Sequence, residues 1–289
     1  MKKIWFLFII ISLTSINGYA QDEFKDKRLE DLKKFIEIVK TDNAEKICEY
    51  ISFPLSRKNP LPPVKDKDDC ISRYADIFDD KLKTAITTSN SDEDWGEVGW
   101  RGIMYERTDI YPVPGAMWFD GVAETSDAPL TGKITAINYQ SDKEKELQKE
   151  LIEKDRNSIY KSLSDFESNS VILDTDKFII RIDNMNDWIA KRYASWSKPK
   201  TMADEPDIII SNGYKNFDGS GGNNYYIFKN GKYIYICYIN VLSSSNSNPA
   251  DITIYKVEQD IDIKNFDWAD FEMITKEEIM EVGAEILRE

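Results

Sequence analysis

The spacing of apolar residues changes its period partway along this chain, and that change constrains the fold more than any other feature. Apolar residues recur at helical spacing over residues 23–41, and two further helices are expected over 42–51 and 70–86. Short strands, separated by glycine and proline turns, are expected over 98–105, 116–119 and 133–139. Helices followed by strands in this way predict an α+β fold.

The second half begins with the clearest helix of the chain, expected over residues 141–166, and then becomes rich in strand-forming residues. The pair Asn230-Gly231 lies between two β-rich runs, 224–229 and 232–242. It predicts a tight hairpin, because a type I′ turn needs positive φ at both of its central positions. Further strands are expected over 171–173, 178–182, 189–196, 207–211 and 252–257.

The chain is expected to end in a helix over residues 275–287, where Thr275 and Glu278 have the spacing of a capping box. We therefore predict two domains after the N-terminal leader. The first is an α+β domain over 21–140. The second is a β-rich domain over 141–289, with a linking helix at its N-terminus and the closing helix at its C-terminus.

The first twenty residues, 1–20, have the composition of a secretory signal peptide. Two lysines stand near the start, an apolar run follows over 4–13, and small residues lead up to Ala20. The apolar run is about ten residues long, whereas a membrane span needs about 20. We expect cleavage, a mature chain that begins near Gln21 without a membrane span, and a periplasmic or secreted location.

The chain contains no histidine, and its 52 acidic and 38 basic residues give a net charge of −14. Without histidine, Ser-His-Asp catalysis, Cys-His catalysis and histidine-ligated zinc are excluded. Carboxylates, Tyr, Lys or an all-oxygen calcium site remain as options for chemistry. The acidic run over 260–262 lacks the spacing of a calcium loop, so we expect no metal and no cofactor. The excess of acid also disfavours nucleic acid as a partner.

The chain has three cysteines, Cys48, Cys70 and Cys237, an odd number for an oxidising compartment. Cys48 and Cys70 fall in neighbouring expected helices, so a disulfide between them is geometrically possible. Cys237 lies in an expected strand and would then stay free. The alternative is three buried thiols that pack as small hydrophobic side chains. Cysteine positions alone do not decide the connectivity.

Several short segments between residues 43 and 141 carry a family pattern: Phe53-Pro54-Leu55, the run GWRGIM over 99–104, GAMWF over 115–119 and GKITAIN over 132–138. Together they resemble exported bacterial proteins of the NTF2-like (cystatin-like α+β) superfamily. The resemblance implies a curved sheet over helices that encloses a cone-shaped pocket. Some members of that superfamily use acid–base residues in the pocket, and others only bind or dimerise. This chain differs by an extra stretch over 106–114 and by its lack of histidine.

The same region supplies the candidate ligand-binding pocket, lined by Tyr74, Phe78, Trp100, Arg101, Met104 and Trp118. Arg101 lies between Trp100 and Gly102. From a strand it could project into the cone and hold a carboxylate, or face solvent instead. The competing interpretation of the aromatic residues is ordinary packing of a curved sheet. No residue of the region stands out as catalytic.

Two functional hypotheses follow from these features. The first is a non-enzymatic exported protein that binds a small molecule or a protein, for instance an inhibitor or immunity protein whose negative charge attracts a basic partner. The second is a small-molecule enzyme with carboxylate or tyrosine acid–base chemistry in the cone. The enzyme predicts a buried carboxylate with a raised pKa in that pocket. The binding protein predicts an apolar or mixed pocket, or a face suited to protein contact.

Overall fold

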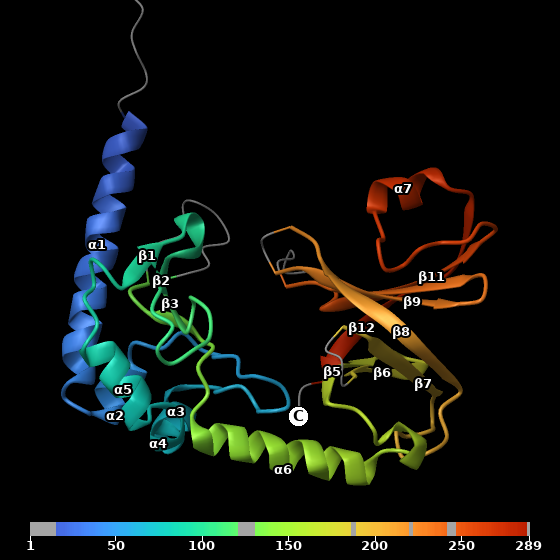
Figure 1. Cartoon of the computed structure of the whole chain (residues 1–289), viewed down its shortest axis with the longest axis horizontal. Coiled ribbons are helices and arrows are strands. Elements are labelled where there is room, and N and C mark those ends of the chain that lie inside the picture. Colours follow the sequence, from blue (N-terminus) through green and yellow to red (C-terminus); the bar gives the residue numbers. More distant parts are fainter. Residues whose placement is uncertain (1–15, 121–130, 186–188, 220–221, 242–246, 288–289) are drawn as a thin grey trace, which may run out of the picture. The chain divides into compact units, whose positions relative to one another are not determined.

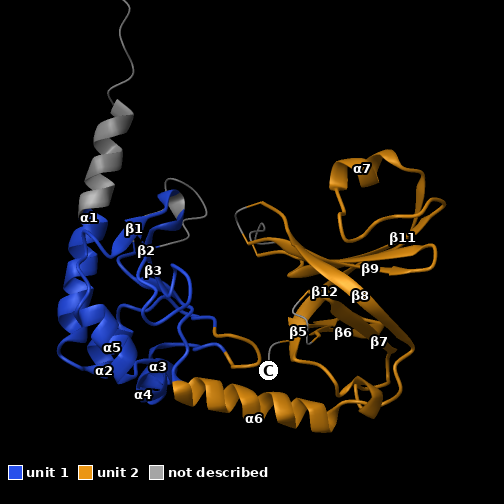
Figure 2. Cartoon of the chain, in the orientation of Figure 1, with its two compact units in different colours: residues 1–56, 63–141 blue, residues 57–62, 142–289 orange. Residues whose placement is uncertain are grey.

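The chain divides into two compact units, drawn in blue and orange in Figure 2. Unit 1 comprises Met1–Ser56 and Pro63–Ser141, and unit 2 comprises Arg57–Pro62 and Asp142–Glu289. The computed structural model describes residues 16–120, 131–185, 189–219, 222–241 and 247–287. The division expected from the sequence lay after residue 140, with the segment 57–62 in the first domain.

Short polar side chains fix where the helices of unit 1 begin. Asn43, Asp66 and Asp79 each accept a hydrogen bond from a backbone N–H in the first turn of the helix that follows. Residues 1–15 of the expected signal peptide lie outside the described residues. The helices are α1 (Ile16–Val39), α2 (Ala44–Cys48), α3 (Lys67–Ser72), α4 (Tyr74–Ile77) and α5 (Asp80–Thr87) (Figure 1).

The single helix expected over residues 70–86 is wrong, because the structure has three short helices in its place. Arg73 separates α3 from α4 with a backbone conformation outside the helical region. Asp79 has extended backbone angles and starts α5 by accepting a hydrogen bond from the backbone N–H of Leu82. Ile77, Phe78 and Leu82 of this segment are nevertheless buried in the core.

An antiparallel sheet in the order β1-β2-β3-β4 completes unit 1. Its strands are β1 (Trp95–Glu97), β2 (Ile103–Tyr105), β3 (Met117–Phe119) and β4 (Ile134–Ile137). Alternate side chains of these strands enter the hydrophobic core together with the helices. Phe119, for example, packs on Phe35 of α1 with the ring centroids 6.2 Å apart.

The strand expected over residues 98–105 is wrong in its first half. Gly99–Arg101 forms a 3₁₀ turn, η1, and the strand β2 begins only at Ile103. Gly102 permits this change of direction, because its φ is 87° and a Cβ there would lie 2.4 Å from the carbonyl oxygen of Phe119. Arg101 is therefore a turn residue rather than a strand residue.

A disulfide between Cys48 and Cys70 joins α2 to α3, with the two Cα atoms 6.0 Å apart. Both half-cystines are buried in the core of unit 1. Cys237 is a free, buried cysteine in unit 2. Of the two arrangements that the sequence left open, the structure has the one with a bridge.

Removing this disulfide should destabilise unit 1, because a bridge across a separation of 22 residues restricts the unfolded chain. The loop-closure entropy corresponds to about 3 kcal/mol. We expect Cys48→Ala/Cys70→Ala to lower the free energy of unfolding of unit 1 by that amount in urea titrations. Dithiothreitol should have a similar effect on the unchanged protein and none on the double variant. Equal stability of the two proteins would contradict the prediction.

Unit 2 contains a closed antiparallel barrel in which each strand pairs with the next and β12 pairs with β5 (Figure 1). This is an up-and-down barrel, and closure leaves no free sheet edge. The hairpin predicted at Asn230-Gly231 is confirmed, since β9 and β10 pair across it. The strands are β5 (Ser168–Asp174), β6 (Phe178–Asn184), β7 (Lys191–Ser197), β8 (Ile208–Phe217), β9 (Asn224–Asn230), β10 (Tyr233–Ile239), β11 (Ala250–Val257) and β12 (Lys276–Leu287).

Successive residues of the barrel strands alternate between an inner core and an outer face. In β10, Tyr235 belongs to the inner core, whereas its neighbour Ile234 belongs to a cluster on the outside. The inner core is packed tightly enough to require a glycine in β8. A Cβ at Gly213 would lie 2.1 Å from the ring of Phe228.

Two segments cover parts of the outer face. The first consists of α6 (Asp142–Ser158) and the 3₁₀ turn η2 (Lys161–Leu163), which precede β5. Its cluster with β7 comprises Ile159, Leu163, Phe166, Ala194 and Trp196. The second is the connection from β11 to β12, residues 258–275, which includes α7 (Trp268–Met273) and packs on β9, β10 and β11. We call this second segment the cap.

The closing helix expected over residues 275–287 is wrong, because Lys276–Leu287 forms strand β12. The strand pairs with β11 over most of its length and with β5 at its end. Helix propensity differs by less than about 1 kcal/mol per ordinary residue, so pairing on both sides outweighs it. The signal for a strand was present as a period of two, in the inward-facing residues Met280, Val282, Ala284 and Ile286.

Candidate functional site

The structure separates the six predicted pocket residues into two groups. Tyr74 and Phe78 lie on the helical side of unit 1, where their rings stack with centroids 5.4 Å apart and Phe78 is buried. Met104 and Trp118 are paired between β2 and β3, and their strand neighbours face the helices. These two side chains therefore lie on the opposite face of the sheet. The side chain of Trp100 lies outside the described residues.

Arg101 joins the second group from the turn η1. Its guanidinium carbon lies 5.5 Å from the centroid of the Trp118 ring. Arg101 is exposed, and Met104 and Trp118 are half-buried. A cation–π contact of this exposed kind contributes about 0.5–1 kcal/mol. Of the two alternatives for Arg101, the structure has the one in which it faces solvent.

A tyrosine and a carboxylate do meet on the helical side of unit 1. The Tyr74 hydroxyl donates to Asp42 Oδ1 at 2.7 Å, and Lys83 Nζ donates to the same oxygen at 3.1 Å. The hydrogen bonds from Tyr74 and Lys83 lower the pKa of Asp42, whereas burial and the bond to Asp42 raise the pKa of Tyr74. Acid–base catalysis favours a pKa near the working pH. The pKa shifts of Asp42 and Tyr74 both lead away from that pH.

A buried carboxylate with a raised pKa is found in unit 2 instead of the predicted pocket. Asp183, on β6, accepts hydrogen bonds from Arg181 Nε at 2.7 Å and from the Arg192 guanidinium at 2.9 Å. Burial raises the pKa of Asp183, and the two arginines oppose that shift. Arg181 also binds both oxygens of Asp155 on α6, at 2.8 and 2.6 Å, and lies 4.5 Å from the Phe166 ring centroid. The pairing of each charged group indicates a structural network rather than a catalytic acid.

Asp183→Asn should destabilise unit 2 strongly, because it leaves two buried guanidinium groups without their shared counter-ion. We expect a loss of about 3–5 kcal/mol in the free energy of unfolding. Asp165→Asn is the matched control. Asp165 binds the same Arg192 at 2.6 Å, but its side chain is 75% exposed, so its loss should cost no more than about 1 kcal/mol. Similar losses for both variants in urea unfolding would contradict this interpretation.

Aromatic packing holds the cap against the barrel. Phe266, Trp268 and Phe271 contact one another, Tyr225 of β9 and Tyr255 of β11, with ring centroids between 5.1 and 6.2 Å apart. Most of these contacts are edge-to-face, the favoured geometry for aromatic pairs. The cap is therefore an ordered part of unit 2 that can present side chains in fixed positions.

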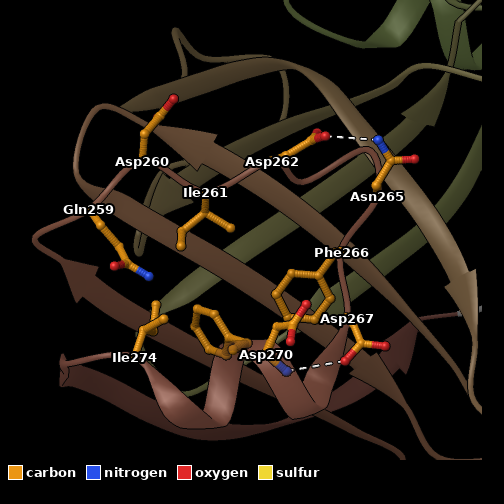
Figure 3. Close-up of a pocket in the computed structure, with 10 residues that line it drawn as sticks. Gln259, Asp260, Ile261, Asp262, Asn265, Phe266, Asp267, Asp270 and Ile274 are labelled. Carbon is orange, nitrogen blue, oxygen red and sulfur yellow. Dashed lines mark hydrogen bonds between the residues drawn. The ribbon is translucent and has the colours of Figure 1, made fainter.

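A cavity of about 180 Å³ opens within the cap (Figure 3). The apolar part of its lining consists of Ile261, Phe266, Phe271 and Ile274. Polar residues complete the lining: Gln259, Asp260, Asp262, Asn265, Asp267 and Asp270. A lining that mixes apolar side chains with carboxylates suits a group that is both apolar and cationic.

Several of the carboxylates that line this cavity also accept hydrogen bonds within the cap. Asp262 accepts hydrogen bonds from Asn265 Nδ2 at 2.8 Å and from the backbone N–H of Lys264 at 3.0 Å, and these bonds lower its pKa. Asp267 caps α7 by accepting from the backbone N–H of Asp270 at 3.1 Å. The bonds to Asp262 favour its ionised form. Part of the negative charge of the cavity lining is thus built into the local structure.

The acidic run over 260–262 was considered only as a calcium loop, and the cavity was missed. Residues 258–274 hold six acidic residues and one lysine, interleaved with aromatic and aliphatic residues. That interleaving was the available signal, because a purely solvated segment needs no such apolar residues. No group of residues able to hold a metal ion occurs in the described part of the chain.

Phe271→Ala should loosen the cap while leaving the barrel folded. Phe271 is 3% exposed and lies at the centre of the aromatic contacts, so its loss opens a large void beneath α7. We expect faster amide hydrogen exchange over 258–275 and unchanged exchange in β6 and β7. Met273→Ala is the control, since Met273 is 78% exposed. A uniform change across unit 2 would contradict a separately ordered cap.

In comparisons with known protein families, curated proteins and solved structures, nothing matches this chain. Among the residues that the structure describes, no helix has the length and apolar character needed to cross a bilayer.

Proposed function

We propose that this protein is an exported, non-enzymatic binding protein and that the cavity of the cap receives a basic side chain of a partner protein. The observation that carries the proposal is the cavity itself, whose lining combines apolar side chains with four aspartates. Lysine and arginine have matching chemistry, with an apolar stem and a cationic end.

The chain already contains one contact of the proposed kind at this place. Lys276 Nζ lies 4.9 Å from the centroid of the Phe271 ring and donates to the carbonyl oxygen of Phe271 at 2.9 Å. This internal lysine uses the aromatic ring of the cap as a cation-binding surface. A partner's lysine or arginine would use the cavity in a similar way, with the aspartates as additional counter-ions.

The charge of the chain supports a basic partner over a neutral one. The net charge of −14 would steer a basic protein toward this one and raise the association rate at low salt. Within the proposal, the protein is an inhibitor or immunity type of protein that covers a basic surface. The signal-peptide-like N-terminus supports action in the periplasm or outside the cell, and an NTF2-like first unit is proposed to contribute a second surface.

A tri-lysine peptide, acetylated and amidated at its ends, is a direct probe of the cavity. In NMR titrations of the full chain, we expect it to shift the amides of residues 258–274, to bind more weakly at high salt, and to bind more tightly than tri-glutamate. Asp270→Asn should weaken binding about threefold, because one exposed charge contributes up to about 1 kcal/mol.

The matched control is Asp176→Asn, an exposed carboxylate in the turn between β5 and β6. It makes the same change in net charge away from the cap. If Asp176→Asn weakens tri-lysine binding as much as Asp270→Asn does, the attraction is only to the overall charge. That result, or an absence of shifts in the cap, would overturn the proposed function.

A further inference from the structure

The ladder between β8 and β9 ends at the connection between these two strands, where four side chains form what we call the rim group. Lys215 pairs with Tyr226, and Phe217 pairs with Asn224. Directly opposite residues of a strand pair share a face, and so do residues two positions apart. Since Tyr226 belongs to the inner core, all four side chains lie on the inner side of the sheet.

Among the residues that the structure describes, Lys215 of this group has no counter-ion. Its Nζ lies 5.3 Å from the ring centroids of both Phe217 and Tyr226, and these rings are its partners within the described residues. Its side chain remains accessible to solvent. Partial burial lowers the pKa of Lys215, and no carboxylate of the described residues opposes that shift. A cation held in this way favours an anion from outside.

Asn224 supplies an independent observation. Its side chain is 7% exposed, and its Nδ2 donates to the carbonyl oxygen of Gly222 at 3.0 Å. Its Oδ1 is buried and has no hydrogen-bond partner in the described part of the chain. A buried acceptor left unpaired costs about 1–3 kcal/mol, so a hydrogen bond donated by a ligand to this oxygen would be favourable.

Phe217 supplies an apolar surface beside these two polar groups. It is 71% exposed, a large apolar side chain in contact with water next to Lys215. On the other side of the group, the Tyr226 hydroxyl is already paired with the Ser170 hydroxyl at 2.7 Å. The groups of the rim group that a ligand can contact are therefore the Lys215 cation, the Asn224 Oδ1 acceptor and the Phe217 ring.

We propose that the rim group binds a small carboxylic acid that has a hydrogen-bond donor on its α-carbon and an apolar side chain. The carboxylate pairs with Lys215, the donor reaches Asn224 Oδ1, and the apolar side chain lies on Phe217. Lys215 and Asn224 are diagonal neighbours in the ladder, a separation that long side chains span. The site is separate from the cap, which covers the outer face of the same strands.

Four related probes test each part of the site in NMR titrations of the full chain. L-phenylalanine and L-phenyllactate carry the carboxylate, an amine or hydroxyl donor, and the ring. 3-Phenylpropionate lacks the donor, and L-phenylalaninamide lacks the carboxylate. We expect the first two to shift amides at the end of β8 and the start of β9. The other two should bind at least about tenfold more weakly, the effect of losing one hydrogen bond to a charged or buried group. Whichever of the first two binds more tightly identifies the donor as amine or hydroxyl.

Lys215→Gln keeps the length of the side chain and removes its charge, and it should weaken L-phenylalanine binding at least about tenfold. Lys177→Gln, in the exposed β5–β6 turn, makes the same charge change and should leave binding unaltered. Thermal unfolding checks that both variants remain folded. Undiminished binding by Lys215→Gln, equal binding of all four probes, or no shifts at the rim up to about 10 mM probe would each overturn the proposal.

Discussion

The pairing of β12 with β5 is the constraint on which unit 2 depends. It is a short ladder, in which Glu285, Ile286 and Leu287 pair with Asp174, Leu173 and Ile172. Without it, the eight strands would form an open sheet with two free edges and an inner face accessible to water. With this pairing, the barrel is closed, and alternate side chains of each strand point into its core or to its outer face. The apolar residues of the outer face are buried by α6 with η2 and by the cap.

The attachment of α6 relies more on charge than on apolar area. Near its start, Glu144 forms a buried ion pair with Arg57, and near its end Asp155 binds Arg181 through both carboxylate oxygens. Buried pairs of this kind gain little net stability over apolar residues, but a wrong arrangement would leave a charge unpaired. They therefore specify one position of the helix. The Arg57 pair also explains why the segment 57–62 belongs to unit 2, and Asn59 strengthens that attachment by donating to the carbonyl oxygen of Asn169 at 2.9 Å.

Features determined by local chemistry could be predicted from the sequence, and features determined by distant partners could not. The hairpin at Asn230-Gly231 was predicted because its turn residues alone favour it. The strand β12 was missed because its own residues also fit a helix, and pairing with β11 and with β5, about a hundred residues earlier, makes a strand the better state. The six residues of the candidate pocket do not share one site, because Met104 and Trp118 lie on the face of the sheet opposite Phe78. Which face they occupy depends on the strand register, and the local sequence does not determine it. The cap cavity depends on the packing of residues 258–275 against β9, β10 and β11, and the rim group depends on the pairing of β8 with β9. Neither arrangement can be read from a local stretch of sequence.

Two neighbouring residues of β9 show how closely the two proposed binding surfaces are linked. Tyr225 points outward and contacts Trp268 of the cap, with ring centroids 5.2 Å apart. Tyr226 points inward, where its ring lies 5.3 Å from Lys215 Nζ. A slip of one residue in the pairing of β9 would exchange these faces, remove the support of the cap and place Lys215 opposite the wrong side chain. The inner core prevents such a slip, because Gly213 leaves room for Phe228 in one register only. The packing that closes the barrel therefore also fixes an acidic surface outside it and a basic one at its rim.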